Sequence, residues 1–191
     1  MKKIFILLAS AFFYTAASAQ TTWTVDKAHS NVKFTATHLM VSDVDGIFKN
    51  YDATITSSKP DFSDAKFQIS IQTASVTTDN DQRDKHISSP DFFEVAKYPT
   101  LTFTSTGITK TSDKHYKLAG NLTLHGVTKP VTFDLWYRGT IVNPMSKADD
   151  AGFQLTGTIN RSDFAFGPSI PNAVVSDEIA IKANGEFGKA K

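Results

Sequence analysis

Few side chains in this 191-residue sequence have the types and spacing that catalysis requires. His29 and Ser30 are adjacent, which brings a candidate general base beside a candidate nucleophile. No Gly-x-Ser-x-Gly elbow surrounds Ser30, however, and adjacent residues of a strand point to opposite faces of a sheet. The sequence therefore predicts no catalytic residue and no enzymatic activity.

Four histidines, His29, His38, His86 and His125, are candidate metal ligands. None of them is paired at the short H-x-x-x-H spacing of common zinc sites, and the chain has no cysteine. Only a cluster assembled by the fold can then hold a metal, and a plain hydrogen-bond network is the favoured alternative. We expect neither a metal site nor a cofactor.

Arg83 and His86 lie in a segment that lacks the alternation of a strand, which predicts a short helical insertion over about 78–95. Three residues apart on a helix, these two side chains share one side. Thr78 or Asp79 is expected to cap its N-terminus, because both types accept hydrogen bonds from the first turn.

The elements that must position these residues are strands. Apolar residues alternate with polar ones in eight runs, or nine if residues 23–25 pair separately, and Ile47 shares its parity with Tyr51. This pattern predicts an all-β, antiparallel fold that closes as a barrel or stacks as a sandwich. Gly120 and Gly157 stand on the apolar parity, and we interpret them as marks of a hollow interior. Periodicity alone nevertheless favours a solid core.

The first residues have the layout of a secretory signal peptide. Lys2 and Lys3 precede an apolar run over 4–14, and small residues at 17–19 suit cleavage. Residues 1–19 are therefore expected to be removed, leaving one domain over 20–191 that is exported and has no transmembrane span. This domain carries 18 basic and 19 acidic residues, which argues against nucleic acid as a partner.

Several motifs cover nearly all of the expected mature chain in order: W-T-V-D-K-A-H-S-N-V-K-F at 23–34, G-I-F at 46–48, R-D-K-H-I at 83–87, P-D-F-F-E-V at 90–95, G-N-L-T-L-H-G-V-T at 120–128, N-R-S-D-F at 160–164 and D-E-I at 177–179. Together they resemble the YceI-like family of lipocalin-like, polyisoprenoid-binding periplasmic proteins. Two positions depart from the family pattern, because Ala165 and Ser176 stand where we expect glycine. Both lie in the 165–177 loop, so its shape is the doubtful part of the resemblance.

The resemblance implies an eight-stranded antiparallel lipocalin-like barrel whose elongated apolar pore holds an isoprenoid, a quinone-like molecule or another lipid. The protein is then a periplasmic carrier or storage protein. The resemblance favours a pore over the solid core that periodicity alone favours. We expect the pore to be lined by eight inward-facing residues: Phe34, Phe67, Phe103, Leu118, Leu122, Phe133, Leu135 and Phe153. A polar head group would meet His29, His38, Arg83 and His86, an assignment that follows from side-chain chemistry alone.

Two other readings stay open on the sequence. A solid barrel is an interaction scaffold if its loops at 140–151 and 165–177 bind a partner protein, and it then contains no cavity. A metal protein that uses the histidines is less favoured. The sequence does not settle the oligomeric state, and a homodimer is compatible with it.

Overall fold

The structure, a computed structural model, describes residues 20–190. The expected signal peptide, 1–19, lies outside these described residues. The strands are β1 Thr21–His38, β2 Ser42–Phe48, β3 Tyr51–Ser57, β4 Lys66–Gln72, β5 Val76–Thr77, β6 Thr100–Ser112, β7 His115–Leu124, β8 Val127–Val142, β9 Asp149–Asn160 and β10 Val175–Lys189. Helical segments are α1 Asp81–Ser88 and the short 3₁₀ helices η1 Thr73–Ser75 and η2 Arg161–Phe164.

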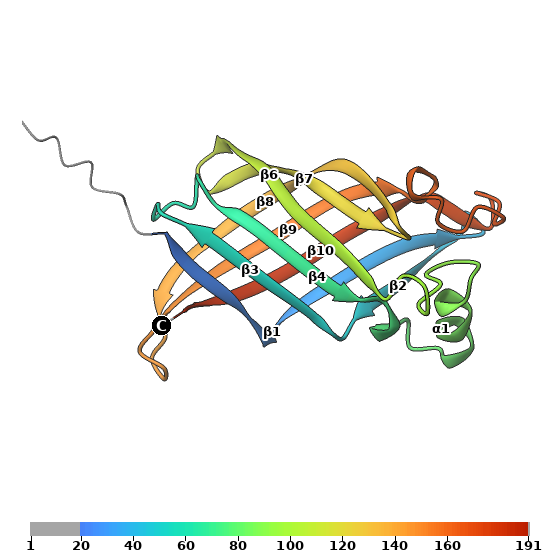
Figure 1. Ribbon diagram of the computed structural model, residues 1–191, viewed down its shortest axis with the longest axis horizontal. Helices are drawn as coiled ribbons and strands as arrows, with labels where there is room; N and C mark the ends of the chain where they lie inside the picture. The colour runs from blue at the N-terminus through green and yellow to red at the C-terminus, as the bar shows by residue number, and fades with distance from the viewer. Residues whose placement is uncertain (1–19, 191) are drawn as a thin grey trace, which may run out of the picture.

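All strand pairings are antiparallel, and the sheet closes into a barrel where β10 pairs with β1 (Figure 1). The first half of β1 pairs with β3 and its second half with β2, so these two strands share one position in the wall. β4 pairs with β3 and β5 pairs with β2, so they share the next position. The ten strands therefore build an eight-position barrel, which confirms the expected fold class.

The β1 strand bends where its pairing with β10 shifts register, between Asp26 and Asn31. Residues 23–25 thus do not form a separate strand but are the first part of β1. The break between β2 and β3 corrects one expectation about side-chain direction. Gly46 and Phe48 are buried on β2, whereas Tyr51 is buried on β3, so Ile47 lies on the opposite parity. The two residues at 49–50 change the phase between the strands.

The interior glycines do not mark a hollow. A Cβ atom on Gly120 would lie 2.4 Å from the ring of Phe103, and one on Gly157 would lie 2.7 Å from the ring of Phe133. These two rings contact each other with centroids 5.6 Å apart. The glycines therefore make room for large aromatic side chains, and the barrel is solidly packed at this level.

One end of the barrel is closed by an aromatic plug. Phe62, on the β3–β4 connection, is 2% exposed, and its ring centroid lies 5.0 Å from those of Tyr137 and Phe153 and 5.3 Å from that of Trp23. The Tyr116 hydroxyl donates to the carbonyl of Asp61 at 2.5 Å, which holds the connection down. Apolar burial thus seals the end at which the described chain begins and ends (Figure 1).

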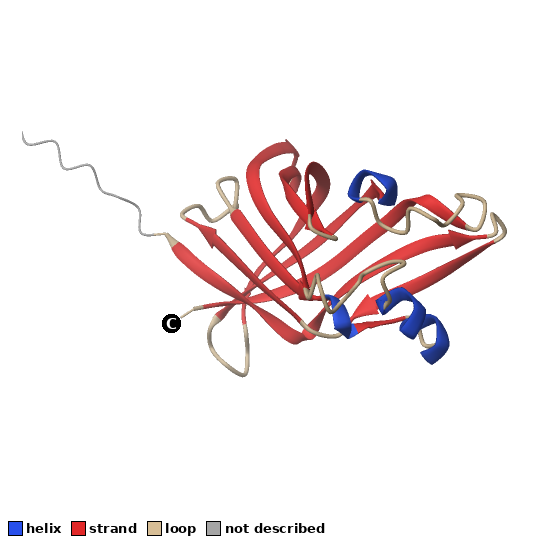
Figure 2. Ribbon diagram, turned by 45° about the vertical axis from the view of Figure 1, so that its right-hand side comes forward, coloured by secondary structure: helices blue, strands red, loops and turns tan. Residues whose placement is uncertain are grey.

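The helix lies near the opposite end (Figure 2). It spans only Asp81–Ser88, within the expected segment, and its cap is neither Thr78 nor Asp79. The Asn80 side chain accepts a hydrogen bond from the backbone N–H of Arg83 at 2.9 Å, because Asn80 has the extended conformation of a cap. Asp79 is left-handed, with a φ of 59°. Within residues 20–190, no helix has the length and apolarity to cross a membrane.

Candidate functional site

A cavity of about 350 Å³ lies inside the barrel at the end that carries α1. This volume falls within the range of roughly 300–1,000 Å³ that is typical of small-molecule sites. The lining is mostly apolar: Phe34, Ala36, Thr37, His38, Val44, Phe48, Arg83, His86, Ile87, Phe92, Phe93, Leu101, Leu124, Ile159, Arg161, Phe166, Ile170, Val174, Val175, Ile179 and Ile181.

Strands and irregular segments share the construction of this cavity. On the strand side, Phe34 pairs with Ile181 across β1 and β10, and alternation directs both side chains inward. The connection that follows α1 adds Phe93, and the 165–177 loop adds Phe166, with ring centroids 4.7 Å apart. The two irregular segments therefore meet over the barrel end and form its partial lid.

The ionisable lining residues are all basic. Arg83, Arg161, His38 and His86 line the cavity, and among the described residues no Asp or Glu does so. His38 and His86 are also exposed to solvent, which places them where the cavity opens. An apolar space with a basic opening suits an amphiphile with an apolar chain and an electron-rich or anionic head.

Arg161 is 3% exposed and holds the 165–177 loop in place. Its guanidinium donates to the carbonyls of Gly167 and Ile170 at 2.7 Å and to Oδ1 of Asn172 at 2.9 Å. Further bonds at 3.1–3.2 Å reach three more backbone carbonyls. Every N–H group of Arg161 is thus engaged, so this residue supplies positive charge to the cavity but no free donor.

The two departures from the family pattern fit this loop. Ala165 has a φ of 50°, the left-handed region in which glycine is least strained. Ser176 uses the side chain that glycine lacks. Its hydroxyl accepts from the backbone N–H of Thr37 at 2.9 Å and donates to the carbonyl of Glu178 at 2.7 Å. Ser176 lies in β10 and not in the loop, and its hydroxyl therefore ties the start of that strand to β1.

Arg83 is oriented by Thr78 and retains free donors. Its Nε donates to Oγ1 of Thr78 at 2.7 Å, and its Nη2 donates to the Thr78 carbonyl at 2.8 Å. Within residues 20–190, Nη1 has no hydrogen-bond partner. Burial alone would raise the pKa of Asp84, but hydrogen bonds from Thr78 outweigh this effect and hold that pKa below its ordinary value. Asp84 therefore stays ionised and fixes Thr78. The structure thus holds Arg83 at the cavity with donors to spare.

His86 lies one helical turn from Arg83, as expected. Its Nε2 is 3.2 Å from Oδ2 of Asp91, and its ring meets that of Phe92 edge-on with centroids 5.2 Å apart. The structure therefore brings Arg83, His86 and His38 to one cavity, although their contact with a head group stays a prediction.

The eight predicted lining residues separate into three groups. Phe34 lines the large cavity, and Phe67, Leu135 and Phe153 line a second, smaller cavity of about 50 Å³ that Ser30 and Asn31 border at the bend of β1. The remaining four are buried in the packed section and line neither cavity: Phe103, Leu118, Leu122 and Phe133. The expected continuous pore is thus interrupted, because aromatic rings fill the barrel at the level of the interior glycines.

The smaller cavity has an unsatisfied polar group. Tyr51 lines it, and among the described residues its buried hydroxyl has no hydrogen-bond partner. Burial raises the pKa of this hydroxyl, and the charge of Asp26 adds to the effect. The nearby amides of Asn31 and Asn184 bond to each other at 3.2 Å instead.

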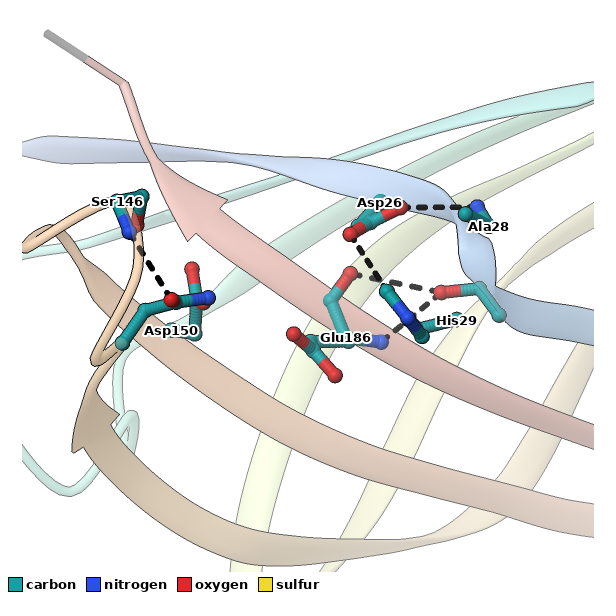
Figure 3. Close-up of polar contacts among 8 residues, drawn as sticks. Asp26, Ala28, His29, Ser146, Asp150 and Glu186 are labelled. Carbon is teal, nitrogen blue, oxygen red and sulfur yellow. Dashed lines mark hydrogen bonds and ion pairs between the residues drawn. The ribbon is translucent and has the colours of Figure 1, made fainter.

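His29 lies apart from the other three predicted head-group residues. It occupies the bend of β1, where its Nδ1 is 2.9 Å from Oδ2 of Asp26 and its side chain is 67% exposed (Figure 3). The hydrogen bond to Asp26 raises the pKa of His29, and the charges of Asp26, Glu186 and Asp150 add to the shift. The outward direction follows from the register shift, which turns residues 27–29 away from the interior.

The histidines do not gather into one metal cluster. Within residues 20–190, three His or carboxylate ligand atoms come within 4.8 Å of one another at Asp26, His29 and Glu186, on the exposed outer side (Figure 3). His125 is elsewhere, in the β7–β8 turn, where its ring packs edge-on against that of Tyr98 with centroids 4.5 Å apart. The fold therefore does not bring the four histidines together at one site.

Sequence reasoning missed the lining residues outside the strands. These residues lie on α1, on the connection that follows it or on the 165–177 loop: Ile87, Phe92, Phe93, Phe166 and Ile170. Strand periodicity cannot detect them. The available signal was composition, since an exposed connection rarely contains a run such as D-F-F at 91–93.

Comparison with known proteins decides the family. Residues 23–187 match the YceI-like domain. The chain belongs to the YceI-like family. A UPF0312 protein of Pseudomonas putida is 36% identical over 189 residues, which cover 95% of this chain and 97% of that relative.

Solved structures of similar proteins have the same barrel. The Campylobacter jejuni YceI protein is 35% identical, with a TM-score of 0.75 over 81% of this chain and 90% of that one. A polyisoprenoid binding domain from Saccharophagus degradans aligns with a TM-score of 0.67 over 88% of this chain and 98% of that domain. At 16% identity, the second likeness shows the fold alone.

Proposed function

We propose that this YceI-like protein binds an isoprenoid-like amphiphile, with the apolar chain inside the 350 Å³ cavity and an anionic head at its basic opening. The observation that carries the proposal is a lining that is apolar throughout except for Thr37 and basic groups. Burial of each methylene-sized unit of such a chain contributes about 0.8 kcal/mol. The polyisoprenoid binding of the Saccharophagus degradans domain supports the same class of ligand.

Arg83 is the proposed partner of the head group. It has free N–H donors, and Thr78 already holds its guanidinium in place. A hydrogen bond to a charged group contributes about 1.5–3 kcal/mol, which is roughly 10–100-fold in affinity. Arg161 adds charge without a bond, because its donors are all engaged.

A solid interaction scaffold is disfavoured by the cavity itself, since that reading requires a filled barrel. We further propose that the protein acts without catalysis as a carrier or store in the periplasm. The basic start and apolar run of residues 1–19 support export. Mass spectrometry of the periplasmic protein is expected to give a chain that begins at Gln20, and an uncleaved chain in the cytoplasm would contradict export.

The test of ligand binding uses a matched pair of probes. The delipidated protein is titrated with farnesyl phosphate and with farnesol, and the same titrations are repeated on Arg83→Gln. We expect wild type to prefer the phosphate by at least about tenfold and the variant to lose that preference while binding farnesol unchanged. No uptake of either probe, together with no lipid extractable from gently purified protein, would refute the proposal.

A further inference from the structure

The tip of the β1–β2 hairpin exposes three consecutive large apolar side chains. Leu39, Met40 and Val41 are 50%, 74% and 82% exposed. Single apolar residues are common on protein surfaces, but a contiguous exposed group marks a surface that contacts another molecule or a membrane.

The turn itself does not account for these residue types. Leu39 has a φ of 50° and Met40 a φ of 59°, in the left-handed region that glycine or asparagine adopts with less strain. The turn is nevertheless well defined, because the N–H of Leu39 donates to the carbonyl of Val174 at 3.0 Å and that of Val41 to the carbonyl of His38 at 3.1 Å. The backbone thus presents large side chains to the exterior from a fixed, strained hairpin.

This tip lies at the opening of the cavity. His38 precedes it and Val44 follows it on β2, and both line the cavity. Val174, which bonds to the tip, lines the cavity too and is 37% exposed. Figure 1 shows this hairpin at the end of the barrel that carries α1 and the 165–177 loop, away from the C-terminus.

We propose that residues 39–41 insert into the surface of a lipid bilayer, so that the ligand passes between the membrane and the cavity without crossing water. This inference rests on the proposed function, because a ligand with a long apolar chain resides mainly in bilayers. A stable protein interface needs about 20–30 residues and roughly 800 Å² on each side, far more than three side chains on a projecting turn provide. A bilayer requires no such matching surface.

The neighbouring charges specify the kind of membrane contact. Asp43 and Asp45 are exposed on β2 just after the tip, where they accept hydrogen bonds from the hydroxyls of Thr37 and Thr35. These carboxylates oppose attraction to anionic lipids. Docking is therefore driven by apolar insertion, so neutral phosphatidylcholine vesicles bind the tip, and added salt leaves that binding in place.

The experiment compares wild type with Met40→Ser/Val41→Ser. Val142→Ser/Met145→Ser is the matched control, because Val142 at the end of β8 and Met145 on the β8–β9 connection are 63% and 91% exposed at the other end of the barrel. Flotation with phosphatidylcholine vesicles measures docking, and transfer of a fluorescent farnesyl phosphate from vesicles measures uptake. We expect the tip variant to lose at least about tenfold in both, and the control to match wild type.

Binding of farnesyl phosphate added without vesicles separates this inference from the proposed function. The inference predicts unchanged affinity there for the tip variant. Equal flotation and transfer for wild type and the tip variant would overturn it and leave ligand binding intact. Flotation by wild type without binding of farnesyl phosphate would instead overturn the proposed ligand and support docking. A dimer that the tip substitutions dissociate, with no flotation, would show that a second copy covers the tip.

Discussion

Filling the cavity provides a test in which stability and binding move in opposite directions. Ala36 lines the cavity on β1, between the pairing partners Val44 and Ile179 that line it too. A cavity of about 150 Å³ accommodates a benzene molecule. The ring introduced by Ala36→Phe therefore fits into 350 Å³, but it removes around two fifths of the space.

The expected magnitudes follow from the area that the new ring covers. Burial of roughly 100 Å² of added apolar surface at about 25 cal/mol per Å² gives about 2.5 kcal/mol. Loss of side-chain freedom and imperfect fit reduce this, so the free energy of unfolding rises by about 1 kcal/mol. Affinity for farnesyl phosphate falls at least about tenfold, because the chain loses at least two methylene-sized contacts.

Chemical denaturation and ligand titration measure the two effects on the same preparation. Lys33→Phe is the control, because Lys33 is exposed on the same strand and the substitution leaves the cavity unchanged. Unchanged affinity in Ala36→Phe would refute the cavity as the binding site. A large drop in the unfolding free energy of Ala36→Phe would show that the cavity has no room for the added ring.

The remaining predictions concern groups outside the opening. The pKa of Asp64 is lowered to about 2: burial would raise it, but hydrogen bonds from two serine hydroxyls outweigh that effect. The stabilisation that ionised Asp64 gives the folded protein is therefore fully present above pH 4 and is lost as the pH falls toward 2. Asp64→Asn should cost about 1–2 kcal/mol at pH 7 and flatten the dependence of the unfolding free energy on pH between about 4 and 2, whereas an unaltered profile would contradict this. Tyr51→Phe should stabilise the protein by about 1 kcal/mol in denaturant titrations, because it removes a buried unpaired hydroxyl, and a loss would show that the hydroxyl has a partner in solution. Arg161→Met should lower the free energy of unfolding by about 3 kcal/mol or more and speed amide hydrogen exchange across 165–177, because the loop loses its hydrogen bonds to the guanidinium. Arg138→Met, at an exposed site, is the control, and equal exchange rates in both variants would show that Arg161 does not hold the loop.

The strands were predictable because a half-buried sheet imposes a period of two on its residues. On β7 the residues of the apolar parity from Tyr116 to Leu124 are all buried, and on β9 Phe153, Leu155 and Ile159 are buried while Gly157 is half-buried. The phase change between β2 and β3 was not predictable, because an interruption of two residues at 49–50 leaves the composition of the run unaltered. Periodicity therefore predicted the wall and missed its local break.

The interior was predicted less well than the wall. Inward direction does not distinguish a side chain that fills the barrel from one that lines a cavity, so Phe103 and Phe34 looked equivalent. Both rings cover a glycine of the neighbouring strand, Gly120 under Phe103 and Gly46 under Phe34. Their difference arises from a long-range pair, because the Phe103 ring contacts that of Phe133 and the two fill the barrel at that level. The cavity also depends on Phe93 and Phe166, which belong to connections without periodicity.

Photoaffinity labelling with a diazirine analogue of farnesyl phosphate tests the central claim most directly. The probe reacts with whatever surrounds its apolar chain, and peptide mass spectrometry identifies the labelled residues. The account predicts labels on cavity residues such as Phe34, Ile181 and Phe166, and competition by unlabelled farnesyl phosphate. Labels confined to the outer surface of the barrel, or labels that the competitor does not reduce, would contradict it.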